Sequence, residues 1–112
     1  MVRPGRMDLW VMRSDGSGKR QVTRDPGASF APFFTPDGKG IIFSSNHKSP
    51  RGGNFDLYLI NVDGTGLEQV TTDGTFDGFP MFSPDGKYLV WASNRHAPRA
   101  NGTDLFVAEW KR

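Results

Sequence analysis

The stretch FTPDGKGIIFSSN at residues 34–46 returns 48 positions later as FSPDGKYLVWASN at residues 82–94. The same shift places DLWVMRSDGSGKRQVT (8–23) on DLYLINVDGTGLEQVT (56–71), and DLFVAEW (104–110) aligns with the start of both. The alignment needs no gap. A repeat of this length indicates structural units that stack on one another.

Each unit has the pattern of short β-strands joined by tight turns. GIIFSSN and YLVWASN are rich in β-forming residues and are bounded by turn residues. DLYLINV is apolar at both odd and even positions, with Leu57 and Leu59 on one face of the strand and Tyr58 and Ile60 on the other. A strand that is apolar on both faces is buried on both faces. We therefore predict four strands in the central unit, at 31–34, 41–45, 56–62 and 67–71, with the proline of the first strand at its beginning.

The turn residues recur at fixed places. Proline presets the first central φ of a turn, and glycine accepts the positive φ that tight reversals require. The predicted turn residues are Pro36, Asp37 and Gly38, then Pro84, Asp85 and Gly86, and Asp63 and Gly64. With 14 glycines and 8 prolines in 112 residues, no long helical period is possible.

Four antiparallel strands in a unit of this length, with faces too apolar for water, are typical of β-propeller blades. We predict one all-β, partial propeller over residues 1–112: a half blade at 8–23, a complete blade at 31–71, and a blade lacking its outer strand at 79–110. A solenoid is disfavoured because its parallel coils do not use hairpin turns. A closed propeller has about four to eight blades. We therefore expect partners in the form of further blades of a longer protein or other copies of the chain. The strand pair at 8–23 is a candidate donor of strands to a neighbouring copy.

The phrases FTPDGK, FSPDGK and DLYLINVDGTGLEQVT resemble the SPDG-type, WD40-like repeat of TolB-like exported proteins. The same repeat occurs in the propellers of prolyl-oligopeptidase-type and tricorn-type peptidases, and the resemblance covers residues 8–110. The TolB-like resemblance is favoured because a strand such as DLFVAEW tends to lie near the end of those chains. It implies a non-catalytic periplasmic or otherwise extracytoplasmic scaffold that binds protein or envelope components, such as the peptidoglycan-associated lipoprotein of the Tol–Pal system. The alternatives are the substrate-gating propeller of a serine peptidase whose catalytic domain is absent from this chain, and a fragment built to assemble from several copies.

Composition excludes several other classes. The net charge of +2 is spread over the chain, so no basic patch predicts a nucleic-acid partner. Cysteine is absent, which excludes disulfides and thiolate metal sites. No apolar run approaches the ~20 residues of a membrane span. MVRPGRMDLW is no signal peptide, so the predicted location rests on the resemblance alone.

No motif predicts catalysis, a cofactor or a metal. A G-x-S-x-G nucleophile elbow is absent. His47 and His96 are the only histidines, and two histidines on separate loops do not make a zinc site. Asp8, Asp56 and Asp104 begin equivalent strands, and a carboxylate that recurs at one position is expected to accept backbone N–H bonds as a structural anchor.

The binding candidates lie in the long loops, which we expect to emerge together on one face of the propeller. These loops are NHKSPRGGNF (46–55), NRHAPRANGT (94–103), RDPGASF (24–30) and TDGTFDGF (72–79). Binding residues commonly occupy loops held by a rigid scaffold. The predicted partner-binding residues are His47, Lys48, Arg51, Asn54, Phe55, Phe76, Asp77, Arg95, His96 and Arg99. For Arg51 and Arg99, which are repeated, pairing with aspartates of their own blades is the alternative.

Overall fold

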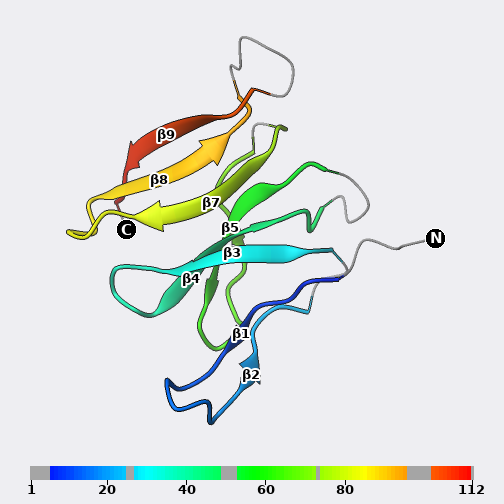
Figure 1. Ribbon diagram of the computed structural model, residues 1–112, viewed down its shortest axis with the longest axis vertical. Coiled ribbons are helices and arrows are strands. Elements are labelled where there is room, and N and C mark those ends of the chain that lie inside the picture. Colours follow the sequence, from blue (N-terminus) through cyan, green and yellow to red (C-terminus); the bar gives the residue numbers. More distant parts are fainter. Residues whose placement is uncertain (1–5, 25–26, 49–52, 73, 96–101, 112) are drawn as a thin grey trace.

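The computed structural model describes residues 6–24, 27–48, 53–72, 74–95 and 102–111, and these residues form three antiparallel β-sheets (Figure 1). The first sheet pairs β1 (Trp10–Val11) with β2 (Arg20–Gln21). The second has the order β3 (Ser29–Phe34), β4 (Gly40–Ser45), β5 (Asp56–Asn61) and β6 (Glu68–Gln69). The third has the order β7 (Asp77–Phe82), β8 (Tyr88–Ser93) and β9 (Asp104–Glu109). This arrangement of two, four and three strands confirms the predicted all-β, incomplete propeller.

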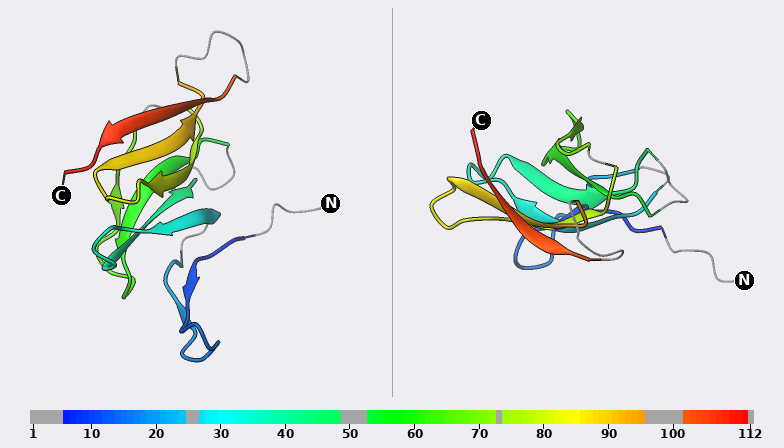
Figure 2. Two further views of the ribbon diagram at one scale, coloured as in Figure 1. Left: turned by 60° about the vertical axis from the view of Figure 1, so that its left-hand side comes forward. Right: turned by 90° about the horizontal axis from the view of Figure 1, so that it is seen from above.

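The sheets pack face to face through two hydrophobic cores. Figure 2 shows how the sheets are twisted relative to one another. The first core lies between the first and second sheets and contains Leu9, Val22, Ile41, Phe43, Tyr58 and Ile60. The second core lies between the second and third sheets and contains Ile42, Leu57, Leu59, Phe82, Leu89 and Trp91. Alternate side chains of β5 enter the two cores, as its apolar pattern predicts, so the central sheet is held from both sides.

Each of β3 and β7 contains a β-bulge near its start, and the observed strand bounds therefore differ from the predicted ones. The register shifts between Phe30 and Phe33, and Ala31 within this bulge has a positive φ of 54°. Pro32 was expected at the beginning of its strand, but β3 begins at Ser29 and Pro32 lies inside it. A bulge leaves residues outside the ladder, so a proline without an N–H is tolerated there. β7 repeats this geometry, with Phe79 at the same φ.

The positive φ of Ala31 leads to a stability prediction. A non-glycine residue in this left-handed region costs about 1–2 kcal/mol, whereas glycine adopts it freely at an entropic cost of about 0.5–1 kcal/mol. We expect Ala31→Gly to raise the free energy of unfolding by about 0.5–1 kcal/mol, measured by urea denaturation with tryptophan fluorescence. The control is Ala108→Gly in β9, which should lower it by a similar amount because Ala108 has an ordinary backbone conformation. Equal losses in the two variants would contradict the assignment of strain to Ala31.

The tight turns are organised by aspartates and glycines. Gly38 and Gly86 have φ of 72° and 73°. The Asp85 carboxylate accepts hydrogen bonds from the Ser83 hydroxyl (2.7 Å) and the Lys87 N–H (3.0 Å). These two donors, the Ser83 hydroxyl above all, lower the pKa of Asp85. Asp37 and Asp63 accept equivalent bonds in their own turns, so each reversal has an internal acceptor.

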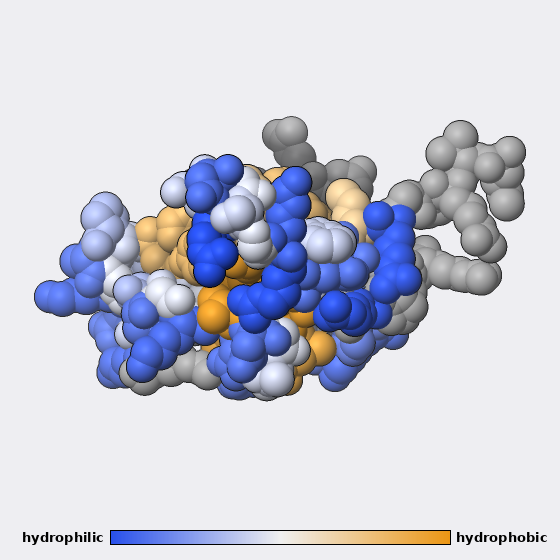
Figure 3. Space-filling model, turned by 90° about the horizontal axis from the view of Figure 1, so that it is seen from below, coloured by the Kyte–Doolittle hydropathy of each residue, from blue (hydrophilic) through white to orange (hydrophobic). Residues whose placement is uncertain are grey.

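The two outermost sheet faces expose apolar side chains. Trp10 on the first sheet is 62% exposed, and Leu105 on the third is 76% exposed. In the repeat, Trp10 aligns with Tyr58 and Leu105 aligns with Leu57, and both of those residues are buried between sheets. Figure 3, seen from the β1–β2 side, shows hydrophobic surface between hydrophilic residues. The outer faces of the first and third sheets therefore expose apolar side chains at positions that the internal sheet contacts bury.

Candidate functional site

The connections between β4 and β5 and those leading into β3 and β7 meet at one end of the sheets. The Asn46 side-chain oxygen accepts the Ala28 N–H at 2.8 Å. The Asn94 N–H donates to the Phe76 carbonyl at 3.0 Å, and the Asp77 N–H donates to the Phe55 carbonyl at 2.7 Å. The last of these bonds joins the second and third sheets, and the other two close the loop ends of the second and third sheets themselves. We call this end the loop face; the tight β3–β4, β5–β6 and β7–β8 turns lie at the other strand ends.

Four phenylalanines form a ring of edge-to-face and tilted contacts on the loop face. Phe30 (β3) contacts Phe55 and Phe79, with ring centroids 5.3 and 5.8 Å apart. Phe76 closes the ring through Phe55 at 5.9 Å and Phe79 at 6.2 Å. Such geometry stabilises aromatic clusters beyond the effect of area burial alone. Phe79 is 57% exposed, and the other three rings are half-buried. This phenylalanine cluster gives the loop face a preformed apolar surface.

The cluster arises where the two repeats differ. Phe30 aligns with Gly78, and Ala31 aligns with Phe79. A Cβ at Gly78 would lie 2.6 Å from the Phe76 Cζ, so glycine makes room for that ring. Phe79 has the same positive φ as Ala31 in the equivalent bulge, although such a φ is uncommon for a bulky residue. Phe55 and Phe76 are predicted from the sequence as binding residues, whereas Phe30 and Phe79 are not; the departure of these two from the repeat was the signal available.

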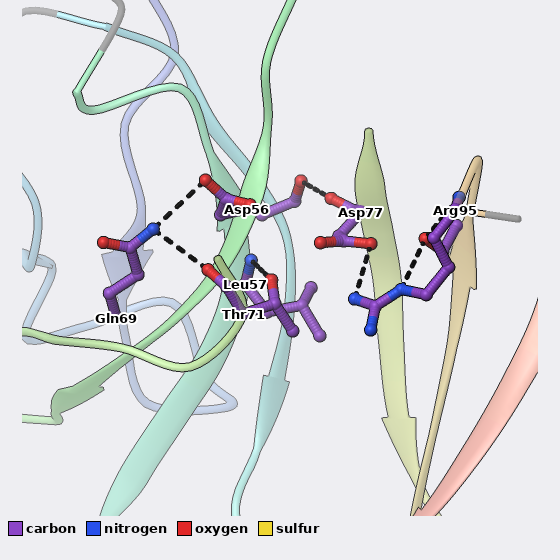
Figure 4. Close-up of polar contacts among 8 residues, drawn as sticks. Asp56, Leu57, Gln69, Thr71, Asp77 and Arg95 are labelled. Carbon is purple, nitrogen blue, oxygen red and sulfur yellow. Dashed lines mark hydrogen bonds and ion pairs between the residues drawn. The ribbon is translucent and has the colours of Figure 1, made fainter. Parts of the chain in front are cut away.

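Asp77 and Arg95, both predicted to bind a partner, contact each other (Figure 4). Asp77 was assigned to a loop, but the bulge extends β7 and makes it a completely buried strand residue. Arg95 Nη2 lies 3.2 Å from the Asp77 carboxylate, and Nε donates to the Ser93 hydroxyl at 3.1 Å. The guanidinium also covers the rings of Trp91 and Phe106, at 5.3 and 5.5 Å from their centroids. This pair holds the base of the loop face in place.

A second polar network links the third and fourth strands of a blade (Figure 4). Gln69 Nε2 donates to the Asp56 carboxylate at 3.1 Å, and the Leu57 N–H donates to the Thr71 hydroxyl at 2.9 Å. In the first sheet, Thr23 donates to Asp8 at 3.1 Å. The recurring aspartates were expected to accept backbone N–H bonds, yet the donors seen here are side chains of the outer strand. The side chains of the outer strand thus supply hydrogen-bond donors to the aspartate that begins the neighbouring strand.

The other predicted residues are distributed unevenly. Lys48 and Asn54 are exposed on the loops, and His47 is half-buried with its ring against Tyr58, 5.8 Å between centroids. Arg51, His96 and Arg99 lie outside the described residues, as does the predicted pairing of the two arginines. The described ranges contain no group of three or more histidine, aspartate or glutamate side chains placed to hold a metal. They also contain no helix that could cross a membrane.

Comparisons with known proteins agree with this architecture. The sequence profile of the TolB beta propeller domain matches residues 6–100. The curated Tol-Pal system protein TolB of Bordetella pertussis is 50% identical over 36 residues, which is 32% of this chain and 8% of that protein. The proteins of the same name from Bordetella parapertussis and Bordetella bronchiseptica match equally.

Two solved structures share the fold. The putative TolB from Agrobacterium tumefaciens superposes with a TM-score of 0.76 and 26% identity, covering 91% of this chain and 37% of that one. TolB from Acinetobacter baumannii has a TM-score of 0.66 and 23% identity, covering 87% and 22% of the two chains. The present chain thus spans well under half the length of these relatives.

Proposed function

Because the chain belongs to the TolB β-propeller domain family, we propose that it is a non-catalytic propeller segment that binds a protein partner through its loop face. The phenylalanine cluster carries this proposal. An apolar surface that remains exposed on a rigid scaffold is typical of a protein-interaction site. The cluster is built by departures from the repeat, so it is not needed to make a blade.

The surroundings of the cluster suit a protein partner. Large aromatic side chains near the centre of an interface commonly supply most of its binding energy, and a polar rim surrounds them. Phe79 is the most exposed ring of the cluster, and the exposed Lys48 and Asn54 belong to the neighbouring loops. The buried Asp77–Arg95 pair and the aromatic contacts fix the cluster before a partner arrives, which lowers the cost of ordering on binding.

For the partner we propose an envelope protein of the Tol–Pal type, in the periplasm or another extracytoplasmic compartment. The support is the family and the curated relatives, which are named Tol-Pal system proteins. We prefer this proposal to the peptidase-propeller alternative because the similar proteins described above are TolB proteins.

The proposal predicts that Phe79→Gly weakens partner binding at least tenfold. Removal of a central aromatic anchor commonly costs about 2 kcal/mol or more, which corresponds to about 30-fold in affinity. Glycine suits the φ of 54° at this position, so the variant should keep its fold, checked by circular dichroism. The measurement is isothermal titration calorimetry with the soluble domain of the peptidoglycan-associated lipoprotein.

The matched control is Phe34→Ala. Phe34 is 55% exposed, close to the 57% of Phe79, but it ends β3 at the turn side of the sheet. Its replacement should change the affinity less than twofold. Equal losses in both variants would contradict the loop face as the binding surface. A failure of the unaltered chain to bind would remove this lipoprotein as the partner.

A further inference from the structure

The contact between the second and third sheets is fixed at Asp77, the first residue of β7. The Ser44 hydroxyl on β4 donates to the Asp77 carbonyl at 2.7 Å, and the Asp77 N–H donates to the Phe55 carbonyl at 2.7 Å. Ser44 and Asp77 are both completely buried. The neighbouring sheet therefore holds both backbone groups of one residue, at a place from which water is excluded.

The four rings of the phenylalanine cluster all start next to these two bonds. The third sheet supplies Phe76 and Phe79, one residue before and two residues after the fixed position. The second sheet supplies the other two rings. Phe55 is itself the acceptor of the N–H, and Phe30 lies opposite Ser44 in the β3–β4 ladder. The cluster is thus assembled across the contact that the two bonds hold.

Ser44 is the part of this contact that the repeat does not require. The backbone bond has an equivalent between the first and second sheets, where the Ser29 N–H donates to the Met7 carbonyl at 2.8 Å. Ser44 aligns with Ala92, which occupies the same place in β8. A strand with alanine at this position therefore folds, and the hydroxyl of Ser44 is an addition to the common blade.

The close packing around Gly78 links the hydroxyl to the rings. A Cβ at Gly78 would lie 2.6 Å from the Phe76 Cζ and 3.5 Å from the Ser44 Oγ. The Gly78 backbone thus passes between the hydroxyl and the ring. Because protein interiors are close-packed, a small shift of one element displaces its neighbours. A shift of β7 relative to β4 therefore changes the space that the Phe76 ring occupies.

We propose that Ser44 is a positioning residue of the phenylalanine cluster: its hydrogen bond to Asp77 sets the distance between β4 and β7 and so brings the rings of the two sheets together. The apolar surface of the loop face is then assembled only while the two sheets are in contact at this point. For partner binding the inference rests on the proposed function, whereas the ring positions can be measured without a partner. A partner that contacts rings of both sheets also stabilises this contact, since a ligand raises the population of the state that it binds.

The test is Ser44→Ala in the full chain, with a fluorine label on the Phe79 ring. Alanine removes the donor to Asp77 and is compatible with the strand, as Ala92 shows. In fluorine NMR, the resonance of the label should move toward its position in the urea-unfolded chain, because the Phe79 ring loses part of its contact with Phe30.

The same variant should bind the soluble domain of the peptidoglycan-associated lipoprotein about three- to tenfold more weakly than the unaltered chain. The apparent affinity falls in proportion to the population in which the cluster is assembled. A factor of about three to ten is what the loss of one neutral hydrogen bond takes from that population.

The matched control is Ser45→Ala, at the next residue of the same strand. Ser45 is 1% exposed, and its hydroxyl bonds within the second sheet, where it accepts from the Ser29 hydroxyl at 3.2 Å and from the His47 N–H at 3.1 Å. Both serine variants should lower the midpoint of urea denaturation. Only Ser44→Ala should move the Phe79 resonance.

A Phe79 resonance that stays in place in Ser44→Ala, or that moves equally in both variants, would overturn the proposal. If Ser44→Ala lowers the folded population, hydrogen exchange of the unaltered chain decides. The Asp77 amide should exchange more slowly than the equivalent Ser29 amide, and equal or faster exchange at Asp77 would overturn the proposal. If the unaltered chain does not bind the lipoprotein, that partner is wrong, while the resonance shift still supports the role of Ser44.

Discussion

Replacing Phe43 with alanine is expected to lower the free energy of unfolding by about 3–5 kcal/mol. The Phe43 side chain is 0% exposed in the middle of β4 and stacks on Tyr58, with ring centroids 6.1 Å apart. It lies in the first core, so its removal leaves a cavity between two sheets. A small domain has a total stability of about 5–15 kcal/mol, so this loss removes a large fraction of the free energy of unfolding.

The measurement is urea denaturation, with Phe34→Ala as the control. Phe34 is 55% exposed, and its truncation should cost less than about 1 kcal/mol. A second variant, Leu57→Ala, removes a completely buried side chain from the second core. Because stacked repeats are stabilised by their contacts with neighbours, both core variants should lower the midpoint of one common transition. Two separate transitions would contradict the view that the central sheet joins both cores.

The fold could be predicted because its information is local and repeated. The alternation of Leu57 and Leu59 with Tyr58 and Ile60 requires burial on both faces, and the structure places these pairs in different cores. The bulge could not be predicted in the same way. Proline was read as the beginning of a strand, since its missing N–H is tolerated there, and a bulge satisfies the same requirement inside a strand.

The loop face was predictable in outline, but its chemistry was not. Connection lengths indicated which loops are long, while the identity of the contacting side chains depends on tertiary packing. Phe79 is 49 residues from Phe30 in the sequence, yet their rings touch across two sheets. Asp77 and Arg95 are binding candidates in the sequence because they fall in the long loops, and the structure pairs them with each other. A charge in a sequence does not reveal whether its counterion lies in the same chain.

The repeat also suggests how the Asp77–Arg95 pair can be exchanged. The substitution Arg95→Ala removes the guanidinium that lies 3.2 Å from the completely buried Asp77 carboxylate. Breaking a buried pair in this way costs about 3–5 kcal/mol, and the partial exposure of Arg95 places the expected loss at about 2–4 kcal/mol. In the second sheet, Ser29 and His47 occupy the two equivalent positions, and Ser29 donates to the Ser45 hydroxyl at 3.2 Å.

The double variant Asp77→Ser with Arg95→His is therefore expected to recover most of the stability that either single variant loses. It installs in the third sheet the serine and histidine that the second sheet has at these positions, next to Ser93, which aligns with Ser45. Replacing both members of a buried pair avoids the penalty of an uncompensated charge, whereas replacing one does not. A double-mutant cycle from urea denaturation measures the coupling between the two positions. If the losses of the single variants simply add, the buried carboxylate does not depend on Arg95, and the loop face must be held by its aromatic contacts instead.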